Sequence, residues 1–207
     1  AGVFRNCTSL AEVSLPDGLL KIYAYAFEKC VMEEVDIPDS VTTMSGSAFY
    51  NCTNLSKVGY PAGWTTTLSS YNSSNSSGGW VSPFYGCTSL KEIVVDEGVT
   101  VIPADAFHEQ KSIEQVILPD SVTTIEGYAF YNATSLKDIE LGDGLSAIKS
   151  YAFVNCAALT ELELPETLSL MENYAFENCS GLKRIHIPSK VTVINTGTFR
   201  GCTGLKQ

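Results

Sequence analysis

Basic residues and histidines are scarce in this sequence. Its 207 residues include 13 Lys and Arg, 23 Asp and Glu and only 2 His, which gives a formal charge of −10. The few Lys and Arg are scattered along the chain rather than clustered. Nucleic acids and anionic membrane surfaces are both bound by clustered cations. We therefore expect no nucleic-acid binding by this chain.

A long apolar run is missing as well. No stretch is long and apolar enough to cross a bilayer, and no charged segment followed by an apolar one opens the chain. We expect no direct membrane contact by this segment. Ala1 and Gln207 both fall inside units of the repeat described below. Both ends are therefore expected to be truncated within a repeat, and the chain to be a piece of a longer protein.

Residues spaced for catalysis or metal binding are missing too. His108 and His186 lie far apart in the sequence, and neither has a recurring nucleophile beside it. No C-x-x-C pair occurs with a zinc-like partner. We expect a protein that is not an enzyme and that has no cofactor and no metal site.

What is present is a column of phenylalanines at regular spacing. All nine are separated by 22 or 23 residues, apart from one interval of 35, and each Cys lies three residues after a Phe. The phenylalanines are Phe4, Phe27, Phe49, Phe84, Phe107, Phe130, Phe153, Phe176 and Phe199, and the cysteines are Cys7, Cys30, Cys52, Cys87, Cys156, Cys179 and Cys202. A fixed period in this range indicates a stacked-repeat architecture. Residues 1–207 are therefore expected to form one elongated domain of about eight 23-residue repeats.

One repeat unit has the pattern of a short strand followed by a turn. The unit reads A-F-x-x-C-x-x-L-x-x-I-x-L-P-x-x-V-x-x-I-x-x-x, and its segment L-x-x-I-x-L ends in the alternation of a half-buried strand. Proline, which cannot donate to a strand ladder, follows in most copies, and Asp-Gly or Asp-Ser then turns the chain. Stacked in register, successive units bury their apolar positions in one continuous core, with parallel strands about 4.8 Å apart.

This unit resembles the BspA-like leucine-rich repeat of bacterial surface proteins. The resemblance covers essentially the whole chain, and the Cys precedes the strand rather than following it as in the common leucine-rich pattern. It implies an α/β-type leucine-rich repeat solenoid, rich in β-structure, with a curved parallel sheet on the concave face and short strands and turns on the convex side. It also implies an exported bacterial protein, extracellular or at the cell surface, that acts as an adhesin-like binding protein.

The cysteines are expected to be buried free thiols. Their column is interrupted by Gln110 and Ala133, and an Ala substitute suits a small buried space filler. Disulfides between adjacent copies, or a metal, are the alternatives.

The third copy carries an insertion at residues 62–81, which is rich in Ser, Asn and Gly. It contains Trp64, Tyr71 and Trp80, and an aromatic set in a polar loop is typical of recognition surfaces. These three residues are candidate ligand contacts. The alternative is that Trp64, which occupies the place of a repeated Val, plugs the core, and that Trp80 closes the repeat where the insertion ends.

The outward side chains of the expected strands form a second candidate site. Alternation places there Glu92, Val94, Gln115, Ile117, Asp138, Glu140, Glu161, Glu163, Arg184 and His186. The apolar pair lies beside a group of carboxylates on adjacent strands. Such a face is either a solvated acidic surface, a site for a basic protein segment, or a weak Ca²⁺ site built from oxygen ligands.

A further aromatic series precedes successive Ala-Phe pairs. It consists of Tyr128, Tyr151 and Tyr174. Stacking as a structural ladder and contact with a ligand are the two interpretations.

These patterns favour a non-catalytic protein-protein interaction module. Solenoids use extended surfaces to bind proteins, and the family resemblance points to a protein ligand from the host matrix or from another cell surface. Carbohydrate binding through the aromatic insertion is an alternative, and a purely structural spacer is another.

Overall fold

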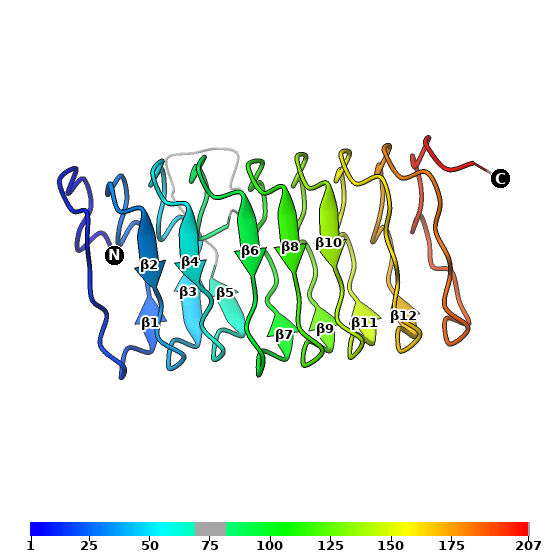
Figure 1. Cartoon of the computed structure of the whole chain (residues 1–207), viewed down its shortest axis with the longest axis horizontal. Helices are drawn as coiled ribbons and strands as arrows, with labels where there is room; N and C mark the ends of the chain where they lie inside the picture. Colours follow the sequence, from blue (N-terminus) through cyan, green and yellow to red (C-terminus); the bar gives the residue numbers. More distant parts are fainter. Residues whose placement is uncertain (69–81, 207) are drawn as a thin grey trace.

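The computed structural model of the protein describes residues 1–68 and 82–206. It is an elongated stack of coils with the two termini at opposite ends (Figure 1). One repeat unit makes one coil, and each coil is named below by its phenylalanine. The Phe107 coil, for example, starts at the pair Ala106-Phe107 and continues to the next Ala-Phe pair.

The coils from Phe27 to Phe130 each contribute short strands to two rows that run along the stack (Figure 1). The first row holds β2 (Glu34–Asp36), β4 (Lys57–Gly59), β6 (Glu92–Val94), β8 (Gln115–Ile117) and β10 (Asp138–Glu140). The second row holds β1 (Lys21–Ile22), β3 (Thr43–Ser45), β5 (Thr66–Leu68), β7 (Val101–Ile102), β9 (Thr124–Ile125), β11 (Ala147–Ile148) and β12 (Leu170–Met171). Every pairing is parallel and joins equivalent residues, as where Ile93 and Ile139 flank Val116. The expected parallel strands are therefore confirmed.

The α/β label is wrong, because residues 1–68 and 82–206 contain no helix. The backbone around the Ala-Phe pair explains why. Tyr128 and Asn132, which flank Phe130, have φ values of 59° and 58°. An α-helix needs an unbroken run of right-handed residues, and two left-handed residues so close together leave no room for one. The protein is an all-β solenoid in the part that the structure describes.

The phenylalanine column forms a stack through the middle of the core. Successive ring centroids of Phe130, Phe153 and Phe176 lie 5.1 and 5.2 Å apart with nearly parallel planes. All three rings are fully buried. Equivalent side chains therefore sit on one another, as the repeat period predicts.

The cysteines are free, and all of them except Cys7 are buried. Their thiols donate to the carbonyl oxygen of a phenylalanine in the preceding coil, for example from Cys52 Sγ to Phe27 O at 2.9 Å. Burial, followed by the neighbouring Cys52 and Cys7, raises the pKa of Cys30 from 9.0 to about 11. Six of the seven cysteines are therefore buried free thiols that fill space, as expected, whereas Cys7 is exposed.

The strand rows are both interrupted at one place, which we call the seam. Within the described residues, β4 pairs only with β2, β5 only with β3, and the next strands, β6 and β7, pair only with later ones. Two large aromatic side chains, Tyr60 and Trp64, are buried there, against the rings of Phe84 and Phe107. The centroids of those two phenylalanines are 6.2 Å apart, wider than elsewhere in the stack. The aromatic bulk thus replaces regular stacking at the seam.

Candidate functional site

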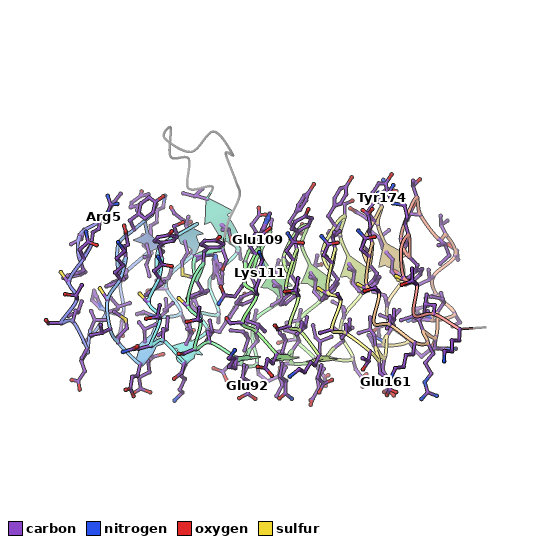
Figure 2. The ribbon with its side chains drawn as sticks, turned by 90° about the horizontal axis from the view of Figure 1, so that it is seen from above. Arg5, Glu92, Glu109, Lys111, Glu161 and Tyr174 are labelled. Atoms are coloured by element: carbon purple, nitrogen blue, oxygen red, sulfur yellow. The ribbon has the colours of Figure 1, made fainter. Side chains whose placement is uncertain are left out.

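The first strand row presents one face to solvent, which we call the strand face. In β6 and β10 the central residues Ile93 and Ile139 are buried, while the flanking Glu92, Asp138 and Glu140 are exposed. Figure 2 shows Glu92 and Glu161 projecting from the same side of the stack. The predicted alternation of inward and outward side chains is confirmed for this row.

The apolar part of this face is small. Val94 is 47% exposed. Ile117 and Gln115 on the neighbouring β8 are less exposed, being half-buried. Val94 and Ile117 are directly paired residues of β6 and β8. The structure therefore brings these predicted residues together, but as a narrow strip.

The acidic part continues beyond the last strand of the row. Residues 161–163 and 184–186 are not strands, yet Glu161 and Glu163 are exposed while Leu162 between them is buried. These two segments line a hollow of about 590 Å³, together with Leu164. Two further predicted residues, Arg184 and His186, also line this hollow.

The charges on this face are only partly neutralised. Arg184 Nη2 lies 3.4 Å from Glu161 Oε1, and His186 Nε2 lies 3.4 Å from Glu166 Oε1. Within residues 1–68 and 82–206, no ion pair involves Asp138, Glu140 or Glu163. These three carboxylates therefore remain available to a cation from outside the chain.

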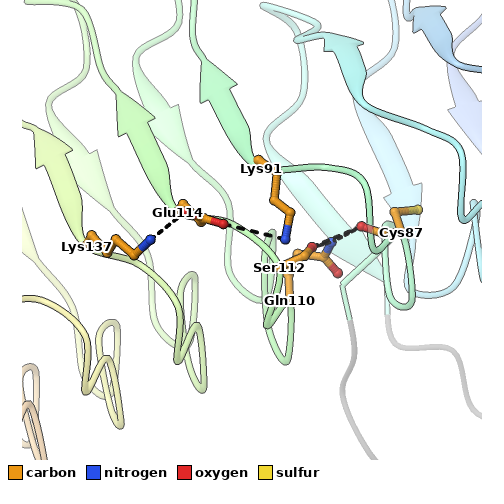
Figure 3. A network of polar contacts seen from close by, with 6 residues as sticks. All are labelled: Cys87, Lys91, Gln110, Ser112, Glu114 and Lys137. Atoms are coloured by element: carbon orange, nitrogen blue, oxygen red, sulfur yellow. Dashed lines mark hydrogen bonds and ion pairs between the residues drawn. The ribbon is translucent and has the colours of Figure 1, made fainter.

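A row of alternating charges borders the strand face, and the sequence reasoning did not identify it. Glu114 lies between two lysines, with Lys137 Nζ at 2.6 Å and Lys91 Nζ at 3.6 Å (Figure 3). The hydrogen bond from Lys137 lowers the pKa of Glu114 below its ordinary value. The signal in the sequence was that these three residues occupy the same place, just before a strand, in consecutive copies.

The tyrosines lie on the opposite side of the stack from the strand face, where Figure 2 shows Tyr174 and Arg5. The ring of Tyr151 stacks on Tyr128 at 4.9 Å and on Tyr174 at 5.2 Å. The guanidinium of Arg200 then covers the Tyr174 ring at 5.1 Å. These three rings therefore form the structural ladder that was one of the two interpretations.

Of the predicted aromatic contacts in the insertion, Trp64 is the one that the structure describes. It is 1% exposed, lies edge-on to Phe84 and Phe107, and donates from Nε1 to Thr66 O at 3.0 Å. The prediction that Trp64 contacts a ligand is wrong, because this side chain fills the core as the alternative proposed. Tyr71 and Trp80 lie outside the described residues.

Metal binding and membrane insertion find no site in the part of the chain that the structure describes. No group of three or more His, Cys, Asp or Glu side chains there could hold a metal ion. No helix of residues 1–68 and 82–206 could span a membrane.

Comparisons with solved structures place the fold among bacterial leucine-rich repeat proteins. A leucine-rich repeat protein from Eubacterium ventriosum is 25% identical with a TM-score of 0.66, over 84% of this chain and 44% of that one. The T. pallidum leucine-rich repeat protein is 28% identical with a TM-score of 0.60, over 79% and 72% of the two chains. The pneumococcal vaccine antigen PcpA shares the fold at 16% identity and a TM-score of 0.52, over 91% and 59%. The chain thus spans less than two thirds of the length of two of these proteins.

The family comparison covers nearly the whole sequence. No curated protein matched the chain. The model described as the BspA type leucine-rich repeat region, in 6 copies, matches residues 1–77 and 81–206. Together with the stacked Phe and Cys columns, this match shows that the chain belongs to the BspA-type leucine-rich repeat family.

Proposed function

We propose that this chain is a non-catalytic protein-binding module of a bacterial cell-surface or secreted protein, and that its strand face is the contact surface. The leucine-rich repeat is in general a non-enzymatic fold, and solenoids use extended surfaces to bind proteins. The surface location rests on the family resemblance. In its support, one protein with this fold is described as a pneumococcal vaccine antigen.

The observation that carries the proposal is the row of exposed carboxylates on adjacent coils. Asp138, Glu140 and Glu163 are exposed and have no ion pair within the described residues. Like charges on neighbouring strands repel one another by about 1 kcal/mol per pair in water. A partner that brings Lys or Arg side chains to this face removes the repulsion. The strand face therefore suits a basic segment of a protein, such as one from the host matrix or a neighbouring cell.

Charge reversal on β10 tests the proposal. The variant Asp138→Lys/Glu140→Lys should weaken binding to a decalysine peptide, and to any member of a panel of purified extracellular-matrix proteins that the unmodified chain binds. We expect the dissociation constant to rise at least about tenfold. Binding should also weaken as salt increases from low to physiological concentration. Surface plasmon resonance measures both effects.

Reversing two exposed acids outside the strand face provides the matched control. Asp96 and Glu97 lie in the turn after β6 and are exposed. Asp96→Lys/Glu97→Lys changes the net charge by the same amount and should leave most of the binding intact. Equal losses for both double variants would show that only net charge matters and would contradict a strand-face site.

The two alternatives have distinct consequences. Carbohydrate binding by the insertion loses one of its three aromatic residues, since Trp64 belongs to the core. A pure spacer predicts that no soluble ligand raises the melting temperature, although any ligand that binds the folded state tightly does so.

A further inference from the structure

An asparagine ladder runs along the turns that follow the phenylalanines. The residue two places after each Phe has a positive φ, for example 58° in Asn132 and 61° in Asn155. Asn tolerates this left-handed backbone better than most residues. Its amide nitrogen also donates to the preceding coil, from Asn178 Nδ2 to Asn155 Oδ1 at 3.0 Å and from Asn155 Nδ2 to Asn132 Oδ1 at 2.5 Å. The ladder fills the surface over these turns.

The ladder ends at the Phe107 coil. There Glu109 replaces Asn, keeps the left-handed backbone with a φ of 59°, and accepts from Asn132 Nδ2 through Oε1. Its other oxygen, Oε2, lies 3.1 Å from Lys111 Nζ. The next position along the ladder is Gly86, which has no side chain. A hollow of about 360 Å³ opens where that side chain is missing.

The hollow has one aromatic wall and one polar wall. Tyr50 and Tyr85 form the first, with parallel rings whose centroids are 5.8 Å apart. Glu109 and Lys111 belong to the second wall, and Figure 2 shows them between the side of the stack that carries Tyr174 and the side that carries Glu92. Asn51 also lines the hollow and supplies an amide. None of the described residues that line this hollow belongs to the strand face, so the two candidate sites consist of different residues.

A fixed scaffold supports the polar wall. Gln110 is 2% exposed, takes the place of the repeated Cys, and donates from Nε2 to Cys87 O at 3.0 Å and to Ser112 Oγ at 2.8 Å. Ser112 Oγ donates in turn to Cys87 O at 3.0 Å (Figure 3). These bonds tie the Phe107 coil to the Phe84 coil beneath the hollow. Binding sites whose groups are held in place before binding lose less free energy to ordering.

The charges of the hollow determine which ligand fits it. Lys111 and Glu109 neutralise each other, so neither a free anion nor a free cation finds an unopposed charge there. The walls nevertheless offer hydrogen-bond donors and acceptors close to an aromatic surface. A sugar ring has hydroxyl groups around its edge and C–H groups on its faces. We infer that this hollow is a binding subsite for one neutral sugar residue of a glycan.

Filling the hollow from within the chain tests the inference. Gly86→Asn introduces the residue that five other copies have at this position. A Cβ added at Gly86 would clash with Asn51 Oδ1 and lie 3.3 Å from Asn51 N, so the flexible Asn51 side chain has to move aside; the φ of 82° suits Asn. The probes are methyl glycosides of glucose, galactose, mannose and N-acetylglucosamine, with binding measured by saturation-transfer NMR. We expect at least one glycoside to bind the unmodified chain and Gly86→Asn to abolish its signal.

Gly201→Asn is the matched control. Gly201 has a φ of 74°, and a Cβ added there would also meet the Oδ1 of an Asn in the preceding coil, Asn178. It lies in the Phe199 coil, away from the hollow, so Gly201→Asn should bind as the unmodified chain does. Tyr85→Leu, which keeps an apolar side chain, should weaken binding about tenfold or more.

Three results would overturn the inference. They are the absence of binding by all four glycosides, binding that survives Gly86→Asn, and equal loss in Gly201→Asn. Decalysine binding by Gly86→Asn should be unchanged, so the fate of this subsite does not decide that of the strand face.

Discussion

Single residues with left-handed backbone determine how each coil turns. Tyr151 and Asn155, with φ of 63° and 61°, flank Phe153 and reverse the chain twice within a few residues. Most residue types are destabilised by about 1–2 kcal/mol in this conformation, and Gly is not. The side chain of Asn155 also bonds both neighbouring coils. The backbone conformation and the side-chain hydrogen bonds of Asn155 therefore both affect the stability of the protein, and two substitutions can separate the two effects.

Asn155→Ala should destabilise the protein more than Asn155→Gly does. Glycine loses only the two amide bonds, worth about 1 kcal/mol together at a partly exposed site, whereas alanine also strains the backbone. We expect losses of about 1 kcal/mol for Gly and about 2 kcal/mol for Ala. Urea unfolding followed by circular dichroism measures the two values. Equal losses would mean that the backbone preference contributes nothing.

Glu172 links stability to acid pH. Burial raises the pKa of its carboxyl, but hydrogen bonds from Lys149 Nζ at 3.0 Å and from Ser150 Oγ at 2.9 Å outweigh burial, so the pKa falls below 4.5. A carboxyl group whose pKa is lower in the folded state stabilises that state at any pH above its pKa in the unfolded chain. This stabilisation is lost as the pH falls through the pKa of the folded state. Glu172→Gln should therefore lose stability at pH 7 and depend less on pH below about 4.5.

Thermal melts between pH 3 and 7 give the comparison. Glu97→Gln, in an exposed turn away from Lys149, is the control. The explanation fails if Glu97→Gln alters the pH profile as much as Glu172→Gln does.

At the scale of the element, two aromatic stacks differ in what they contribute. The rings of the Phe stack between Phe49 and Phe176 are fully buried, whereas the tyrosine ladder is partly exposed. Phe130→Ala leaves a cavity and should cost about 3–5 kcal/mol. Tyr151→Ala leaves a residue with a Cβ at the left-handed position, so the backbone strain there is unchanged. It removes only stacking contacts and should cost about 1–2 kcal/mol. Chemical denaturation of both variants measures the difference. A larger loss of stability for Tyr151→Ala than for Phe130→Ala would contradict the view that the Phe stack is the main source of core stability.

The repeat period was enough to predict the regular elements. Identical spacing of Phe and Cys predicted vertical stacking, and alternation around Ile139 predicted which side chains of β10 face solvent. The α/β label was wrong because the sequence does not show where φ becomes positive. Tyr and Lys are not residue types from which a left-handed backbone is predicted. Tyr128 and Lys29 both have such a backbone.

The candidate sites were predicted less completely, for physical reasons. The strand face follows from alternation alone, so its residues could be read from the sequence. Trp64 could not be assigned, since a large aromatic side chain fits either a binding loop or a gap in the core, and only the packing against Phe84 decides. The proposed sugar subsite could not be predicted from the sequence, because the hollow depends on the absence of a side chain at Gly86.

At the scale of the whole molecule, the seam divides the stack into two blocks. Both strand rows are unpaired there within the described residues. The phenylalanine side remains joined, with Phe49 N bonded to Pro83 O at 2.8 Å and Asn51 N bonded to Tyr85 O at 3.0 Å. Tyr60 Oη and Thr67 Oγ1 are buried without a hydrogen-bond partner among the described residues. Few contacts and unsatisfied polar groups mark regions of low local stability.

Hydrogen exchange should reveal the seam. Amides of β7 should exchange faster than those of β9 and β11, because amides in this row donate to the preceding coil and β7 has no paired strand on that side. Mass spectrometry of peptides from each strand provides the rates. Uniform protection along the second row would contradict a division into blocks.

The one-sided join at the seam also has a mechanical consequence. Among the described residues, the backbone hydrogen bonds that cross this plane lie on its phenylalanine side. When the two ends of the stack are pulled apart, we therefore expect that side to act as a hinge while the strands on the other side separate. The first extension event should then be a rotation of two intact blocks about Phe49 and Pro83, with coils unravelling only at higher force.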